Sequence, residues 1–223
     1  MRKLLSLIAA MTTALPLVSE AAVVNLTIKV ENLAPAGSVA FAPLHFGLHG
    51  GVFDAFNLGD EAGLGIVSVA EGGSGSAWFP AFAAADPTAV LGTVLPSPAG
   101  PLLPGATGTA RVTVDTSNNP YFTFAAMVIP SNDFFIGNDS PTQYRLFDAL
   151  GGLQVTSITQ RARDVWDAGS EVFDASAAAF VGNNDLRAAQ HSVVALNFAE
   201  LGVRRSDDGC RLRLREPIGR RQR

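Results

Sequence analysis

Hydrophobic and polar residues alternate over several short stretches of the chain. Over 24–31 every even position is apolar and every odd position is polar, and 110–115 repeats this pattern. A period of two is typical of a β-strand that buries one face. The run 121–129 is apolar almost throughout, which predicts a strand buried on both faces. Apolar runs predict four further strands, over 39–48, 89–95, 153–158 and 192–198.

Turn-forming residues separate these strands. Gly, Pro, Asn, Asp and Ser cluster over 96–104, 118–120 and 182–185. About seven strands joined by such turns are typical of an antiparallel β-sandwich, so the predicted fold class is mostly β. Apolar residues at helical spacing after a capping Asp predict a short helix over 60–71, and 141–150 is a candidate for a second.

The first residues have the pattern of an export signal. Met1 to Lys3 are followed by an uncharged stretch over 4–18, and Ser19 and Ala21 place small residues where a signal peptidase cleaves. The apolar stretch is about 15 residues long, shorter than the roughly 20 that a membrane-spanning helix needs. We therefore predict a signal peptide over 1–21, a secreted or periplasmic protein, and no transmembrane segment in the mature chain.

Composition narrows the class of protein. Hydrophobic residues make up 48% of the chain and charged residues only 16%, which excludes wholesale disorder. Cys210 is the one cysteine of the sequence, so neither an internal disulfide nor a cysteine-based metal site can form. Motifs of the common enzyme classes are missing: the chain has no Gly-x-Ser-x-Gly, no phosphate-binding loop, and no glutamate at zinc-protease spacing beside His45 and His49.

Charge divides the chain into two parts. Residues 204–223 hold eight arginines against Asp207, Asp208 and Glu216, whereas the rest of the chain is acidic and the whole chain has a net charge of −4. We predict a folded domain over 22–203 and an Arg-rich, disordered tail over 204–223, with a basic arm for anionic surfaces as the alternative for the tail. The acidic body argues against nucleic-acid binding through the folded domain and is compatible with cation binding.

Acidic residues gather in two predicted loops. One loop, 130–139, contains Asp133, and the other, 164–171, contains Asp167 and Glu171 with Gly169 between them. Ca²⁺ is bound by carboxylate and carbonyl oxygens of sharply turning loops, so these three carboxylates are candidate ligands of one ion. Asp-rich loops are also common as ordinary solvated turns, and the spacing alone leaves both interpretations open.

The same two loops resemble the spondin N-terminal domain family. The similarity lies in 127–139 and 164–171, with support from 30–35, 47–54, 92–95 and 121–125, and it extends over about 24–198. The resemblance implies a C2-like β-sandwich that binds Ca²⁺ at one end through Asp133, Asp167 and Glu171. Two departures are visible: Glu171 replaces an aspartate of the animal family members, and Arg-rich sequence stands where a closing strand is expected.

Three functions follow as hypotheses. The first is an exported, non-enzymatic, calcium-binding module in adhesion or the extracellular matrix, whose partner is an unknown extracellular protein or glycan. The alternative is a carbohydrate-acting hydrolase with Asp133 and Asp167 as paired carboxylates and a cleft lined by Trp78, Trp166, Phe134 and Phe135. The third is a structural surface protein with an incidental metal site.

Overall fold

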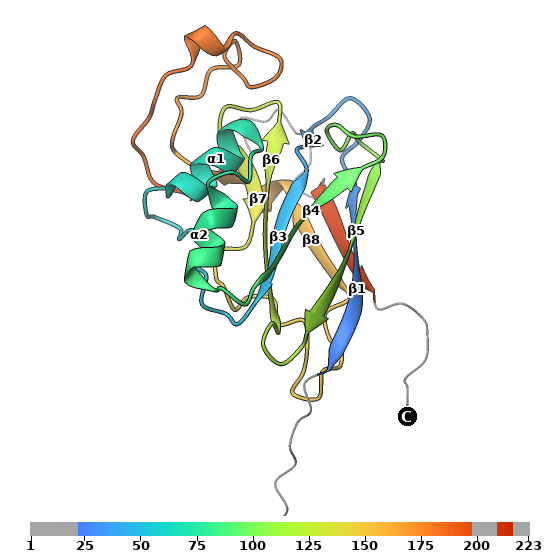
Figure 1. The fold of residues 1–223 in the computed structure, drawn as a ribbon. Coiled ribbons are helices and arrows are strands. Elements are labelled where there is room, and N and C mark those ends of the chain that lie inside the picture. Colours follow the sequence, from blue (N-terminus) through green and yellow to red (C-terminus); the bar gives the residue numbers. More distant parts are fainter. Residues whose placement is uncertain (1–21, 198–208, 216–223) are drawn as a thin grey trace, which may run out of the picture.

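The computed structural model describes residues 22–197 and 209–215, and within them the chain forms an 11-stranded sheet and two α-helices (Figure 1). The strands are β1 (Val23–Asn32), β2 (Ala40–Phe41), β3 (Leu44–His49), β4 (Val90–Pro96), β5 (Thr107–Asp115), β6 (Tyr121–Ile129), β7 (Phe134–Gly137), β8 (Ser157–Arg161), β9 (Trp166–Asp167), β10 (Ala195–Leu196) and β11 (Gly209–Arg215). The helices are α1 (Leu64–Gly72) and α2 (Trp78–Ala85), and two 3-10 turns are η1 (Ala162–Asp164) and η2 (Asn184–Leu186).

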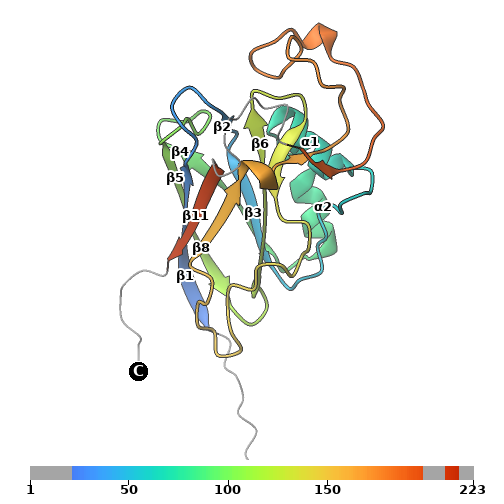
Figure 2. The ribbon, with the colours of Figure 1, turned by 180° about the vertical axis from the view of Figure 1, so that it is seen from behind.

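The sheet is antiparallel and curls until its two halves face each other (Figures 1 and 2). Its strand order is β10-β9-β7-β6-β3-β4-β5-β1-β11-β8, and β2 pairs with β6 off this path. Strand β4 joins the halves, because it pairs with β3 along most of its length but with β5 only through Leu95 and Pro96. The predicted class, a mostly β, antiparallel and sandwich-like fold with short helices, is confirmed.

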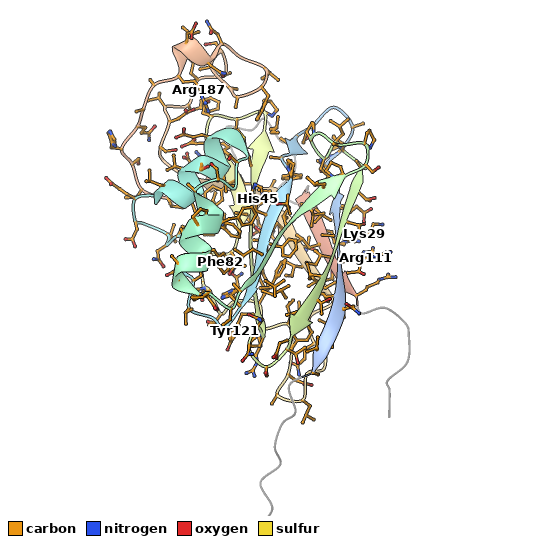
Figure 3. The ribbon with its side chains drawn as sticks, viewed as in Figure 1. Lys29, His45, Phe82, Arg111, Tyr121 and Arg187 are labelled. Carbon is orange, nitrogen blue, oxygen red and sulfur yellow. The ribbon has the colours of Figure 1, made fainter. Side chains whose placement is uncertain are left out.

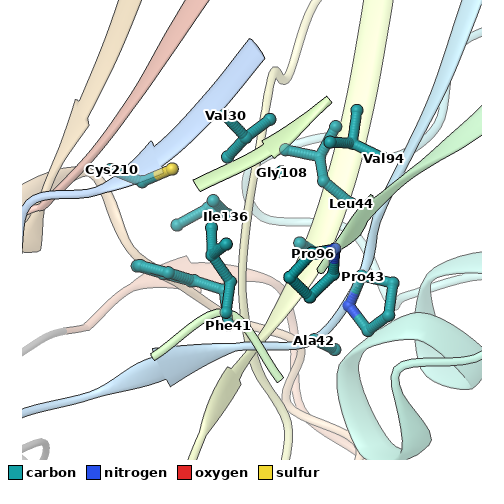
Figure 4. Close-up of a pocket in the computed structure, with 12 residues that line it drawn as sticks. Val30, Phe41, Ala42, Pro43, Leu44, Val94, Pro96, Gly108, Ile136 and Cys210 are labelled. Carbon is teal, nitrogen blue, oxygen red and sulfur yellow. The ribbon is translucent and has the colours of Figure 1, made fainter. Parts of the chain in front are cut away.

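The core fills the space between the two halves. The alternation in β1 places Leu26, Ile28 and Val30 inside, in the same apolar cluster as Phe122 and Phe124 of β6. Each such side chain contributes roughly 1.5–3 kcal/mol on burial. A cavity between the halves, lined among others by Val30 and Cys210, has a volume of about 10 Å³ (Figure 4). That volume would hold about one water molecule, so the cavity is a packing gap and no ligand site.

The two helices cover the outer side of the half that contains β3, β6 and β7 (Figure 1). They bury Ile66, Val69, Trp78 and Phe82 against Ala125 of β6 and its neighbours. Helix α1 ends at Gly72, and Gly73, with a φ of 64°, caps its last turn. Within the part of the chain that the structure describes, no helix has the length and apolar character needed to cross a membrane.

Several predicted elements differ from those observed. The region 141–150 forms turns and isolated bridges and no helix, and the helix predicted over 60–71 begins only at Leu64. Strand 39–48 is interrupted after Phe41, and in 192–197, the described part of the predicted strand 192–198, only β10 forms. Helix α2 was not predicted from the sequence, and it contains Pro80. A proline in the first turn costs no hydrogen bond, since the first N–H groups of a helix have no partner within the helix.

The prediction of a disordered tail is wrong for 209–215. These residues form β11, which lies between β1 and β8 and joins β8 to the rest of the sheet (Figure 2). Cys210, Leu212 and Leu214 are fully buried, whereas the intervening arginines face outward. Apolar residues alternate with arginines over 209–215, which is the pattern of a strand. The high arginine content nevertheless led to the prediction of a disordered tail. The predicted signal peptide over 1–21 lies outside the described residues, as do 204–208 and 216–223 of the predicted tail.

Candidate metal centre

The turn between β6 and β7 positions Asp133. Ser131 holds this turn, because its hydroxyl donates to the Val128 carbonyl at 2.7 Å and accepts from the Phe134 N–H at 3.1 Å. Asp133 is 1% exposed, and its Oδ2 accepts hydrogen bonds from the backbone N–H groups of Ser170 at 2.7 Å and Glu171 at 2.9 Å. This carboxylate therefore ties the first predicted loop to the second.

Asp167 lies beside it on β9, which pairs with β7 and β10. Its Oδ1 accepts from the Gly169 N–H at 2.8 Å and its Oδ2 from the Asn197 amide at 3.1 Å. Gly169 has a φ of 67°, and a Cβ there would lie 2.9 Å from the carbonyl carbon of Ser192. Only glycine fits this tight turn, as the sequence predicted.

Glu171 forms an ion pair that the sequence did not predict. The Nε of Arg187 lies 2.9 Å from Oε1 and 3.0 Å from Oε2 of Glu171. The same guanidinium donates to the carbonyls of Glu71 at 2.9 Å and Asn132 at 3.3 Å. Arg187 comes from the long loop between β9 and β10 that extends beyond the sheet (Figure 3). Arg187 therefore supplies positive charge at this end of the molecule.

Burial and neighbouring charges shift the pKa values of Asp133 and Glu171. Burial raises the pKa of Asp133 to about 6, and the negative charge of Asp167 adds to this rise, while the hydrogen bonds from Glu171 and Ser170 oppose it. Burial also raises the pKa of Glu171, although the charge of Arg187 lowers it. The structure thus brings all three predicted residues into one region, where Arg187 offsets part of their negative charge.

The carboxylate oxygens of these residues are the ligand type that a hard cation prefers, but only some of them are placed to bind one ion. Asp133 and Asp167 offer carboxylate oxygens, and none of the described residues donates a hydrogen bond to Oδ1 of Asp133. Glu171, however, is turned toward Arg187. Consistent with this, the described residues contain no group of three His, Cys, Asp or Glu side chains placed to hold a metal ion. The buried amide nitrogen of Asn132 also lacks a partner there, but an N–H donor is no ligand for a cation.

Other acidic, aromatic and histidine residues of the domain have structural roles. Asp164 and Asp174 cap nearby turns by accepting from the N–H groups of Arg161 and Ser176. Three of the four aromatic side chains proposed for a hydrolase cleft do not face solvent, because Trp78, Phe134 and Phe135 are at most 1% exposed. His49 is fully buried, its Nε2 lies 3.0 Å from the Thr123 hydroxyl, and burial lowers its pKa to about 4.

Arg187 is the residue of this region that sequence reasoning missed. It stands alone in a polar stretch, with no spacing or motif that connects it to Glu171, so no local signal points to it. Comparisons with known proteins add no ligand assignment, since no model of a protein family matches the chain and no curated protein matches it. The similarity to spondin N-terminal domains therefore rests on the loops around Asp133 and Asp167 and stays a prediction.

Proposed function

We propose that this chain is an exported, non-enzymatic β-sandwich module that binds Ca²⁺ through Asp133, Asp167 and Glu171 and acts in adhesion or the extracellular matrix. The observation that supports the proposal best is the environment of Asp133. This carboxyl group is 1% exposed and lies next to a second carboxylate, and burial raises its pKa to about 6. A buried carboxylate near like charges is costly to ionise, and a divalent cation would remove that cost.

Binding would also join the loops at this end of the sheet. The carboxylate of Asp133 already connects the turn after β6 with Ser170 and Glu171. Bound Ca²⁺ supplies two positive charges and accepts six to eight oxygen ligands, drawn from carboxylates and carbonyls. Glu171 would take part only after its carboxylate turns away from Arg187, so the guanidinium competes with the ion. A rigid loop end of this kind suits a surface that recognises a partner.

Thermal unfolding of the chain 22–223 in CaCl₂ and in EDTA tests the proposal. At a Ca²⁺ concentration 100-fold above its Kd, the expected stabilisation is about 2.7 kcal/mol, which corresponds to roughly 5–10 °C in Tm. Asp167→Asn should abolish the shift, whereas Asp164→Asn, which removes a nearby acid that caps a turn, should keep it. Arg187→Gln should lower the Ca²⁺ concentration needed for half the shift. A Tm that does not respond to Ca²⁺ would disprove the proposed site.

The hydrolase alternative has one supporting observation. Two neighbouring carboxyl groups, of which one has a raised pKa, are a pattern of acid–base catalysis. The burial of Asp133 and of three of the four aromatic candidates leaves no substrate access at these side chains in the described structure. Turnover of a glycan that Asp133→Ala abolishes without loss of fold would favour the hydrolase over the binding module.

A further inference from the structure

The outward face of the strands β5, β1, β11 and β8 is strongly basic. We call this surface the basic face. Alternation places every second residue of each strand on it, and Figure 3 shows Lys29 and Arg111 at its surface. It carries two acids, Glu31 and Asp115, against six cations: Lys29, Arg111, Arg161, Arg211, Arg213 and Arg215. The whole chain has a net charge of −4, so positive charge is concentrated here.

The strand register brings like charges close together. Lys29 lies directly opposite Arg213 on β11, and Arg211 and Arg215 are the next outward residues on either side of Arg213. Across the other edge of β1, Arg111 lies opposite Thr27 and is diagonal to Lys29. Neighbouring strands lie about 5 Å apart and alternate residues of a strand about 7 Å apart. Like charges at such cross-strand positions destabilise a sheet.

The two acids of the basic face neutralise little of the charge of Lys29 and of the arginines on β11. Glu31 faces Arg211, but the carboxylate of Asp115 is used in its own turn, where it accepts from the N–H of Ser117 at 2.9 Å and the amide of Asn118 at 3.0 Å. No ion pair joins Lys29 or Arg213 to another residue in 22–197 or 209–215. The sheet therefore holds a row of positive charges that an external anion would stabilise.

The surface between the cations suits a hydroxyl-rich ligand. The other outward side chains are mostly small and polar, namely Asn25, Thr27, Thr107, Thr109, Thr113, Ser157 and Thr159. The basic face has two open depressions, one over β1 and β5 and the other beside β11. One is lined by Thr27, Arg111 and Thr113, and the other by Ser157 and the three arginines of β11. Guanidinium groups bind carboxylate and sulfate in bidentate geometry, and hydroxyl groups add hydrogen bonds to sugars.

We propose that the basic face binds an acidic polysaccharide, one that carries carboxylate or sulfate groups along a linear chain. A chain laid along β11 would meet successive arginines about 7 Å apart. The outward residues include no aromatic side chain, on which bases of single-stranded nucleic acid would stack. Of the outward residues of these strands only Val23, at one end, is a large exposed apolar side chain that could enter a bilayer. The inference does not depend on the proposed calcium site.

Binding of the chain 22–223 to heparin, polygalacturonate and neutral dextran tests the proposal. With EDTA present and at low salt, we expect binding to at least one acidic polysaccharide, none to dextran, and an affinity that falls steeply with added salt. For the Arg213→Thr variant the Kd should rise roughly tenfold or more, because a charge-assisted contact is lost. Arg163→Thr removes a positive charge outside the basic face and should leave affinity unchanged.

A double variant separates loss of binding from loss of fold. Lys29→Thr/Arg213→Thr removes the directly opposed cations and keeps residues that favour strands, so its Tm should equal or exceed that of the unchanged protein while binding is lost. Unchanged binding by this variant, or no binding to either acidic polysaccharide at low salt, would overturn the proposal. Tighter binding to duplex DNA, or to vesicles of phosphatidylserine and phosphatidylcholine, would assign the face to that partner instead.

Discussion

Asp133 is a residue whose ionisation opposes folding. An exposed aspartate loses its proton near pH 3.8, but burial in the folded protein raises the pKa of Asp133 to about 6. Between these values the unfolded chain has released the proton and the folded chain retains it. Raising the pH through this window therefore lowers the free energy of unfolding, and the loss is complete above pH 6.

The size of this loss gives a residue-scale prediction. A difference of about two pKa units corresponds to on the order of 3 kcal/mol. In EDTA, Asp133→Asn should be more stable than the unchanged protein at pH 7.5 by up to this amount, and the two should converge at pH 4. Urea unfolding at both values measures the difference. The burial that lowers the pKa of His49 to about 4 destabilises the protein as the pH falls below 6.5, but both proteins share this effect. A difference that does not change with pH would contradict the prediction.

At the scale of elements, the close contact between β3 and α2 depends on a glycine in β3, which has no side chain. A Cβ at Gly47 would lie 2.4 Å from the ring of Phe82. That ring is fully buried and stacks on Phe53 with centroids 3.9 Å apart, so it has little room to move. Glycine at this position therefore sets how closely the helix approaches the sheet.

The Gly47→Ala substitution tests this contact. Overpacking of a filled core costs about 1–3 kcal/mol, and we expect a loss of that size in the free energy of unfolding. Gly72→Ala is the matched control, because a Cβ there meets nothing within 4 Å and alanine favours the helix by roughly 0.5–1 kcal/mol. Equal effects of the two substitutions would show that the approach of α2 is not limited by Gly47.

For the whole molecule, the continuity of the sheet from β1 to β8 depends on β11. This strand pairs with β1 on one side and β8 on the other, and it buries Cys210, Leu212 and Leu214 completely. Each buried leucine contributes roughly 1.5–3 kcal/mol, and total stabilities are commonly about 5–15 kcal/mol. The loss of β11 would also leave an edge of β1 unpaired beside an opened core.

A truncation gives the corresponding prediction. The chain 22–203 should not unfold cooperatively, because it lacks the strand that completes the core. The chain 22–215, which keeps β11, is the control and should show one cooperative urea transition with a near-ultraviolet circular dichroism signal. A cooperative transition of 22–203 at the same urea concentration would show that β11 is dispensable.

Local patterns in the sequence were enough to predict much of the sheet. The alternation over 24–31 and 110–115 marks β1 and β5, and the apolar run over 121–129 marks β6, because strand geometry repeats every two residues. The short strands β7 and β9 were assigned to loops. Both lie in Asp-rich stretches, and their pairing with each other depends on neighbours distant in the sequence. The candidate site was located by its two acidic loops, which the structure brings together.

The sequence by itself was enough to predict the class of fold, the main strands from their alternation every two residues, and the two loops that carry the three candidate carboxylates. Tertiary structure alone decided that 209–215 pairs with β1 and β8, that Arg187 pairs with Glu171, and that Lys29 faces Arg213. The physical reason is that a period of two reports only which side of a strand is apolar. Which strands become neighbours depends on the burial of the whole core, and that choice brings distant charges together.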